Sequence, residues 1–212
     1  HRRFLVSELS GKSNVLLKAK EWNLRLDKES PETRAILGKV QDLENQGYQF
    51  EAAEASFELL MRRVLNREKK FFTIVESQVG NQKVGEGSPI ATAAVKVSVK
   101  GKTFEGICDH GDGPVDALYR ALVAALRKSY PEIDLIPLTD YKVRVVDSKA
   151  GTAAKVRVFI QFQDAHDIWT TVGVDKNIIE ASWQALIEAV LISIVGGLIG
   201  IAAGFSGSRV IA

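Results

Sequence analysis

The feature that most constrains this chain is a pattern of two strands and a helix that occurs twice in its second half. In the first copy, apolar and polar residues alternate over residues 94–99 and 103–108 around a Lys-Gly-Lys turn, which is typical of a β-hairpin. In the second copy, extended runs at residues 155–163 and 168–174 take the same place. A helix with one apolar stripe follows each pair of strands. The stripes are Val115, Leu118, Leu122 and Leu126 in the first copy, and Ile179, Trp183, Leu186 and Val190 in the second. The duplication predicts an α+β fold in which an antiparallel sheet packs on two helices.

Both helices are expected to begin at a short turn of small or polar residues. Pro114 follows Gly111-Asp112-Gly113 and suits a first helical position, because its φ is fixed and its missing N–H has no partner there. The second helix is expected to begin near Asn177. Unpaired N–H groups and the helix dipole allow such an end to hold a carboxylate or a phosphate. A glycine turn before a helix is more often only a turn than a binding site. The prediction of a binding site therefore depends on the second helix start, which repeats the pattern.

Three segments are expected along the chain. Residues 1–70 form a small helical linker subdomain, with one helix starting at Ser30-Pro31 and ending at Gly47, and a second from about residue 51 to residue 65. Residues 71–188 form the duplicated domain, which includes a half-buried strand near residues 141–146. Residues 189–212 form an apolar tail. The predicted buried face of the first linker helix consists of Ala35, Ile36, Val40 and Leu43.

Composition and motifs give no sign of catalysis within these residues. The formal net charge of +2 is too small to indicate a nucleic-acid surface. The single cysteine, Cys108, favours a small buried side chain and a reducing, cytoplasmic setting. The three histidines stand in no metal-binding motif, and Ser-Gly-Lys-Ser at residues 10–13 lacks the upstream glycine of a P-loop. We therefore expect no catalytic residue, metal site or cofactor in this chain.

Six dispersed segments carry a resemblance to a known family. They are residues 2–14, 50–57, 113–117, 140–145, 151–158 and 177–186. In this order they resemble the C-terminal part of the citramalate synthase branch of the 2-isopropylmalate synthase family, over about residues 1–187. Relatives often have Ser-Gly-Arg-His in the linker, whereas this chain has Ser10-Gly11-Lys12-Ser13. The missing histidine favours the citramalate branch and puts in doubt a linker contribution to the neighbouring active site.

The resemblance implies a domain order and a division of roles. A TIM barrel with a divalent metal held by a His-x-His motif condenses acetyl-CoA with a 2-keto acid, and a helical linker leads to a LeuA-type regulatory domain. That domain forms a homodimer and binds a branched-chain amino acid, isoleucine or leucine, as a feedback effector. The barrel motifs are absent from these residues, so this chain is expected to be inactive alone. The alternatives are the same region of a 2-isopropylmalate synthase and a free-standing amino-acid sensor; upstream sequence would separate them.

The helix starts and the resemblance together predict where the effector binds. Its carboxylate needs N–H donors and its side chain needs a dry pocket. Asp112 is expected to pair with the ammonium group, and a β-branched residue at Gly113 is expected to obstruct the carboxylate and to force an unfavourable φ. One predicted wall consists of Gly111, Asp112, Gly113, Pro114 and Ala117, and the other of Asn177, Ile178, Ile179 and Ala181.

The final segment departs from the family. Residues 189–208 carry no charged side chain, and this stretch is about as long as a membrane span. Within it Gly196, Gly200 and Gly204 are spaced as in close-packed membrane helices. The stretch resembles a transmembrane helix of an ABC-transporter permease of the lipoprotein-export or macrolide-export type. A membrane partner is expected only if this tail is genuine, and a junction from sequence assembly or a shifted reading frame is the simpler origin of the segment.

Overall fold

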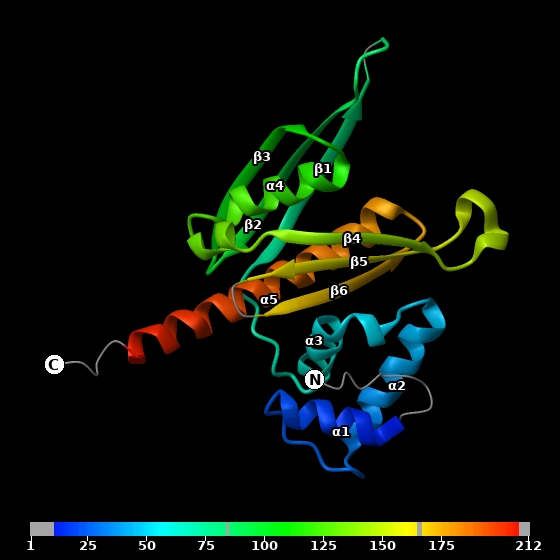
Figure 1. Cartoon of the computed structure of the whole chain (residues 1–212), viewed down its shortest axis with the longest axis vertical. Coiled ribbons are helices and arrows are strands. Elements are labelled where there is room, and N and C mark those ends of the chain that lie inside the picture. The colour runs from blue at the N-terminus through cyan, green and yellow to red at the C-terminus, as the bar shows by residue number, and fades with distance from the viewer. Residues whose placement is uncertain (1–10, 84, 165–166, 208–212) are drawn as a thin grey trace. The chain divides into compact units, whose positions relative to one another are not determined.

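The computed structural model describes residues 11–83, 85–164 and 167–207, with the backbone alone for residues 11, 12, 135 and 195–207 (Figure 1). Contacts divide the chain into two compact units. Unit 1 comprises residues 1–69, 139–161 and 167–189, and unit 2 comprises residues 70–138, 162–166 and 190–212.

Four helical elements form the first part of unit 1. They are α1 (Gly11–Glu21), α2 (Pro31–Gln46), the 3-10 turn η1 (Phe50–Ala52) and α3 (Glu54–Val64). They enclose a core of large apolar side chains. Fully buried members of this core include Ile36, Phe50, Phe57 and Met61. The aromatic rings of Phe50 and Phe57 pack with their centroids 5.8 Å apart.

Helix α2 has the ends that the sequence predicts. The Ser30 side chain accepts a hydrogen bond from the Thr33 N–H at 3.1 Å, and Pro31 is the first helical residue. Gly47 ends the helix with φ +111°, a left-handed conformation that favours glycine. The predicted buried face is wrong at one position, because Ala35 is exposed, whereas Ile36 and Val40 are buried and Leu43 is half-buried. The apolar stripe therefore passes to one side of Ala35.

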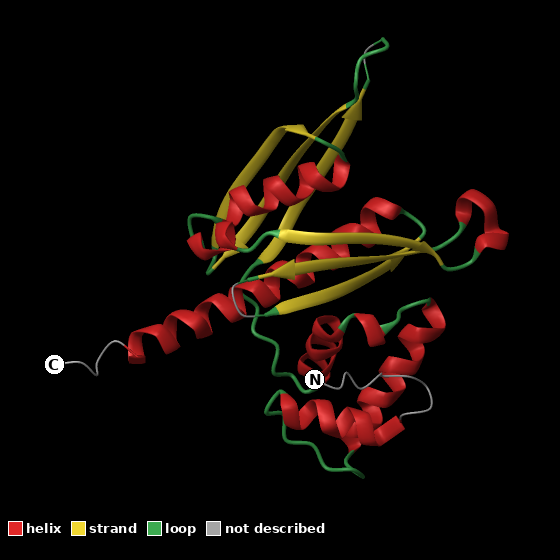
Figure 2. Cartoon of the chain, viewed as in Figure 1, coloured by secondary structure: helices red, strands yellow, loops and turns green. Residues whose placement is uncertain are grey.

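The first repeat lies in unit 2 as a three-stranded sheet with one helix (Figure 2). Strands β1 (Thr73–Gln82), β2 (Ile90–Val99) and β3 (Lys102–Gly111) pair antiparallel in that order. The turn between β2 and β3 has positive φ at Lys100 (49°) and Gly101 (78°), as a type I′ hairpin requires. Helix α4 (Pro114–Leu126) follows, and then the 3-10 turn η2 (Pro131–Leu135).

Helix α4 packs against one face of this sheet. The residues of β2 that face it, among them Val95 and Val97, are fully buried and alternate with more exposed ones. The helix comes closest at Gly106 of β3, where an added Cβ would lie within 3.0 Å of the backbone of Ala121. Glycine is therefore required at this position by the close approach of the helix backbone.

The second repeat has the same order of elements. Strand β4 (Leu138–Val145), the 3-10 segment η3 (Ser148–Ala153), strands β5 (Val156–Gln163) and β6 (Ile168–Asp175) and helix α5 (Ile178–Gly207) follow one another. The sheet order is β4-β5-β6, and the short connections between its strands allow only antiparallel pairing. Close packing recurs at Gly173, where an added Cβ would meet the backbone of Ala181.

The predicted α+β fold with an internal duplication is confirmed. Each copy contains three strands and a helix, so the strand that precedes each predicted hairpin belongs to the repeat, and each helix has its own sheet. The contacts group most of the second repeat with the linker helices in unit 1, and the first repeat with unit 2. The sequence domains 1–70, 71–188 and 189–212 describe order along the chain, and their boundaries stay a prediction.

The tail continues helix α5 to Gly207. Ala189, Val190 and Ile194 are buried. In the part of the chain that the structure describes, no helix is long and apolar enough to cross a membrane. The side chains of residues 195–207 and all of residues 208–212 lie outside the description, so the expectation for the 189–212 tail falls largely outside it as well.

Candidate functional site

The first predicted wall lies where β3 ends and α4 begins, in unit 2. Gly111 is buried, and a Cβ there would be 2.7 Å from the Cβ of Ala117, so the turn lies directly on the first turn of the helix. Gly113 is the residue before the helix, and Pro114 is its first residue, as the sequence predicts. Ala117 is fully buried, so its side chain supports the turn from inside.

An arginine closes this turn. Arg120 donates from Nε to Asp116 and from Nη2 to Asp112, each at 3.1 Å, and the Asp112 N–H donates to Asp116 at 3.0 Å. The hydrogen bond with Asp116 raises the pKa of Arg120. Asp112 is almost fully exposed, so its ion pair is weak, but a ligand ammonium would have to share this carboxylate with Arg120.

The expectation of backbone strain at Gly113 is wrong. Its φ is −177° and its ψ is 171°, an extended conformation that any residue adopts. No atom lies within 4 Å of the position of an added Cβ. A larger residue at Gly113 would therefore project into open space without disturbing the fold, which makes it a clean probe of ligand approach.

The second predicted wall lies between β6 and α5, in unit 1. Asn177 Oδ1 accepts from the Ile179 N–H at 2.9 Å, and Asp175 Oδ1 accepts from the Asn177 N–H at 2.8 Å. The N–H groups of Asn177 and Ile179, which were expected to bind the ligand, therefore already have acceptors within the chain. Ile178 is exposed and Ala181 is buried. The two walls belong to different units. Asn177 caps the start of α5, whereas no side chain caps the start of α4 at Gly113.

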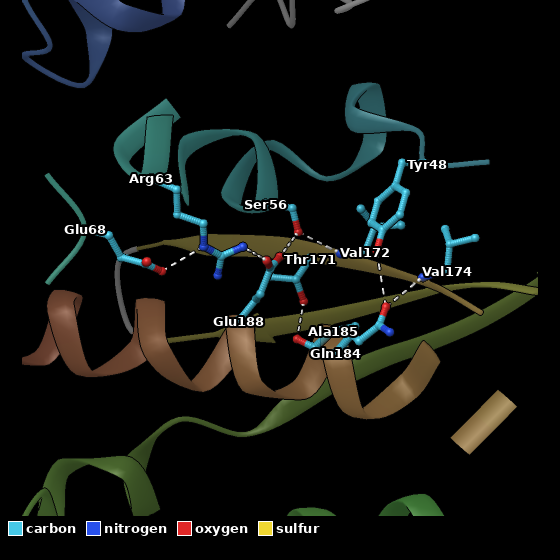
Figure 3. Close-up of polar contacts among 10 residues, drawn as sticks. All are labelled: Tyr48, Ser56, Arg63, Glu68, Thr171, Val172, Val174, Gln184, Ala185 and Glu188. Atoms are coloured by element: carbon cyan, nitrogen blue, oxygen red, sulfur yellow. Dashed lines mark hydrogen bonds and ion pairs between the residues drawn. The ribbon is translucent and has the colours of Figure 1, made fainter. Parts of the chain in front are cut away.

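A polar network in unit 1 was not predicted from the sequence (Figure 3). Ser56 of α3 donates from Oγ to Glu188 of α5 at 2.5 Å and accepts the Val172 N–H at 2.9 Å. Arg63 donates to Glu188 at 2.6 Å and to Glu68 at 2.8 Å. The network therefore connects helix α3, strand β6 and helix α5.

The same network closes the free edge of the second sheet. Strand β6 lies at the edge of the order β4-β5-β6, where alternate backbone N–H groups have no neighbouring strand. Ser56 accepts from Val172, and Gln184 Oε1 accepts from Val174 at 3.3 Å and from the Tyr48 hydroxyl at 3.2 Å. Side chains thus replace a strand at this edge.

Burial and the neighbouring charges shift the pKa values of the network in opposite directions. Burial raises the pKa of the Glu188 carboxyl, and Arg63 and Ser56, which lower it, do not reverse this shift. Burial lowers the pKa of Arg63, but the attraction of Glu188 and hydrogen bonds to Glu68 and Glu188 outweigh it. The Glu188 end of this pair is largely buried whereas the Arg63 side chain is 42% exposed, so removing Arg63 should cost more than removing Glu188, because it leaves the buried carboxylate without its cation.

A cavity of about 480 Å³ lies beside this network in unit 1. Its walls are mostly apolar and come from α2, α3, the segment between them and Glu188 of α5. The lining residues are Ala35, Lys39, Leu43, Tyr48, Phe50, Ser56, Leu60, Arg63, Val64 and Glu188. The described residues contain no group of three or more histidine, cysteine, aspartate or glutamate side chains that could hold a metal ion.

Little in the sequence could have revealed this site. Ser56 and Glu188 are 132 positions apart, and each reads as an ordinary polar residue of a helix. The one usable signal is that Glu188, with Ile187 before it and Ala189 after it, interrupts an apolar run. A carboxylate at such a position needs a partner, but the sequence does not say which one.

Residues 51–193 match the family described as the LeuA allosteric (dimerisation) domain. The chain belongs to this family. The match includes α3, both repeats and the first part of α5, and it ends at residue 193, within the segment that the sequence set apart as a tail.

The similar proteins fall into two groups. The (R)-citramalate synthases of Geobacter sulfurreducens and Synechocystis sp. are 48% and 47% identical to the chain, each over 89% of it. The 2-isopropylmalate synthase of Clostridium kluyveri is 34% identical over 48% of the chain. The chain covers 36% and 35% of the two citramalate synthases, about a third of their length, and 18% of the isopropylmalate synthase.

Proposed function

We propose that this chain is the regulatory and dimerisation portion of an (R)-citramalate synthase and binds a branched-chain amino acid as a feedback effector. The observation that carries the proposal is the extent of the similarity. Citramalate synthases match 89% of the chain at 48% and 47% identity, whereas the isopropylmalate synthase matches 48% of it at 34%. The difference favours the citramalate branch over the alternative that the sequence left open.

Membership of a dimerisation domain family supports self-association of the chain. Each sheet also carries several exposed large apolar side chains, which a second copy of the chain would cover. Examples are Ile107 of β3 at 60% exposure and Val145 of β4 at 58%. Light scattering coupled to size-exclusion chromatography should give a dimer at micromolar concentration, and a clean monomer would refute this part of the proposal.

Each helix start is proposed by itself as a place where the carboxylate of the effector binds. Free N–H groups at a helix start favour a carboxylate, and a small buried side chain beside it, Ala117 at α4 and Ala181 at α5, leaves room for the backbone of the amino acid. Calorimetry with isoleucine and with leucine should show binding to the chain. Gly113→Val should abolish it and leave the fold intact, since the position of an added Cβ has open space around it.

Asp112→Asn is the more conservative variant of the same site. It should weaken binding by about 1–3 kcal/mol if the carboxylate pairs with the ligand ammonium. The lower end is expected, because Arg120 already engages Asp112. If the chain binds neither amino acid, the effector assignment fails; if Gly113→Val binds normally, the pocket lies elsewhere.

The catalytic activity is proposed for the longer protein. Condensation of acetyl-CoA with pyruvate would require a metal-dependent barrel, so the chain alone should release no thiol from acetyl-CoA with or without divalent metal. Turnover by the purified chain would contradict this division of roles. A barrel upstream of residue 1 in the gene would exclude a free-standing sensor, and we expect the protein to act in the reducing cytoplasm.

A further inference from the structure

The cavity in unit 1 has the features of a small-molecule site. Its volume of about 480 Å³ falls within the usual range for such sites, roughly 300–1,000 Å³. Leu43, Leu60 and Val64 contribute apolar walls, and a few polar groups lie among them. It is lined by residues of α2, α3, the segment between them and α5, none of which belongs to either predicted wall.

The charges of the lining select the kind of ligand. The charged residues of its lining are Lys39, Arg63 and Glu188, and Arg63 also pairs with Glu68 outside the lining, so Arg63 has two carboxylate partners and Lys39 has none among the described residues. Both Glu188 oxygens already accept hydrogen bonds, one from Ser56 and one from Arg63. Lys39 is exposed and has no hydrogen bond or ion pair within the described residues. The uncommitted charge at this cavity is therefore positive.

Arg63 adds to this preference. Its Nε donates to Glu68 and its Nη1 to Glu188, while the contacts of the described residues leave Nη2 without an acceptor. A guanidinium N–H can therefore be offered to an anion without breaking the pair beneath the cavity.

We propose that this cavity binds an aliphatic monocarboxylate, with its carboxylate near Lys39 and the free face of Arg63 and its hydrocarbon body against Leu43, Leu60 and Val64. The unpaired ammonium of Lys39 and the free N–H groups of Arg63 select the carboxylate, and the apolar walls select the body. The residues of this cavity are not those of the proposed effector site.

Titration of the full chain with hexanoate, followed by amide chemical shifts, tests the proposal. Hexanoate should shift amides of α2 and α3 with a dissociation constant of about 1 mM or below, as expected of a small, half-open site. Hexan-1-ol has the same body without the charge and should bind at least fivefold more weakly. Equal binding of the alcohol, or no shift in these helices at about 10 mM hexanoate, would overturn the proposal.

Three variants make the test specific. Lys39→Gln should lower hexanoate affinity about fivefold. Ala35→Phe should abolish binding by filling the cavity, and it should fold, because Ala35 is exposed on α2. Lys28→Gln removes an exposed charge outside the lining and should have no effect.

The pattern across the variants shows whether the carboxylate binds in this cavity. Unchanged affinity in Lys39→Gln or Ala35→Phe would refute the site, and so would an equal loss in Lys28→Gln. A titration with leucine distinguishes this site from the proposed effector site. Amide shifts at the helix starts that leucine causes and Gly113→Val removes would belong to the effector site, and they would not change the result with hexanoate.

Discussion

Adding one methyl group at Gly106 or at Gly173 should separate a helix from its sheet. A Cβ at Gly106 would lie less than 3.0 Å from the carbonyl oxygen of Ala121 and from the amide nitrogen of Ala125. At Gly173 it would meet the carbonyl oxygen of Ala181 in the same way. These atoms are helix backbone, so they cannot turn aside as a flexible side chain does.

The geometry sets the size of the effect. Ordinary carbon contacts lie near 3.5–4.0 Å, so the helix would have to retreat by on the order of 1 Å. In α4 this retreat would loosen the packing of its buried side chains, which include Leu118, Leu122 and Leu126. Overpacking of a core typically costs 1–3 kcal/mol, and we expect about 3 kcal/mol for Gly106→Ala and for Gly173→Ala because backbone must move.

Gly113→Ala is the matched control, since it makes the same chemical change in a glycine with open space around it. Its cost should stay within about 1 kcal/mol, the usual effect of alanine at a helix N-cap. Urea unfolding followed by circular dichroism measures all three variants. Similar losses in Gly106→Ala and Gly113→Ala would show that α4 does not approach β3 as closely as the structure has it.

Three further predictions concern the buried network and a helix cap. Burial raises the Glu188 pKa above its ordinary 4.5, so the folded chain binds this proton more tightly than the unfolded chain does. The protonated carboxyl therefore adds to the free energy of unfolding below pH 4.5, and this contribution is lost as the pH rises through the raised pKa. Glu188→Gln should remove this pH dependence in urea unfolding, and an unchanged profile would contradict the burial. Ser56→Ala should cost about 1–3 kcal/mol by leaving the Val172 N–H without its acceptor, a loss that Ser56→Thr should largely avert. Ser30→Ala should cost about 1 kcal/mol by removing the acceptor for the Thr33 N–H, and no change in melting temperature would argue against the cap.

The sequence by itself determined the local elements and the class of fold. Pro114 after Gly113, Ser30 before Pro31 and a final Gly47 mark helix ends through their own φ preferences and side-chain acceptors, which act within a few residues. The stripes of α4 and α5 and the alternation in β2 predicted which faces are buried, because burial follows the period of each element. The resemblance also identified the family that residues 51–193 match.

Only the tertiary structure decided which distant residues meet. The network of Ser56, Arg63 and Glu188 joins positions more than 120 residues apart, and helical periodicity carries no information about such a pairing. The requirement for glycine at Gly106 comes from a helix that passes over it, whereas Gly113, which the sequence singled out, has no such neighbour. Local conformational preferences are fixed by a residue and its neighbours in sequence, whereas close approach and charge burial depend on the packing of elements that are remote in sequence.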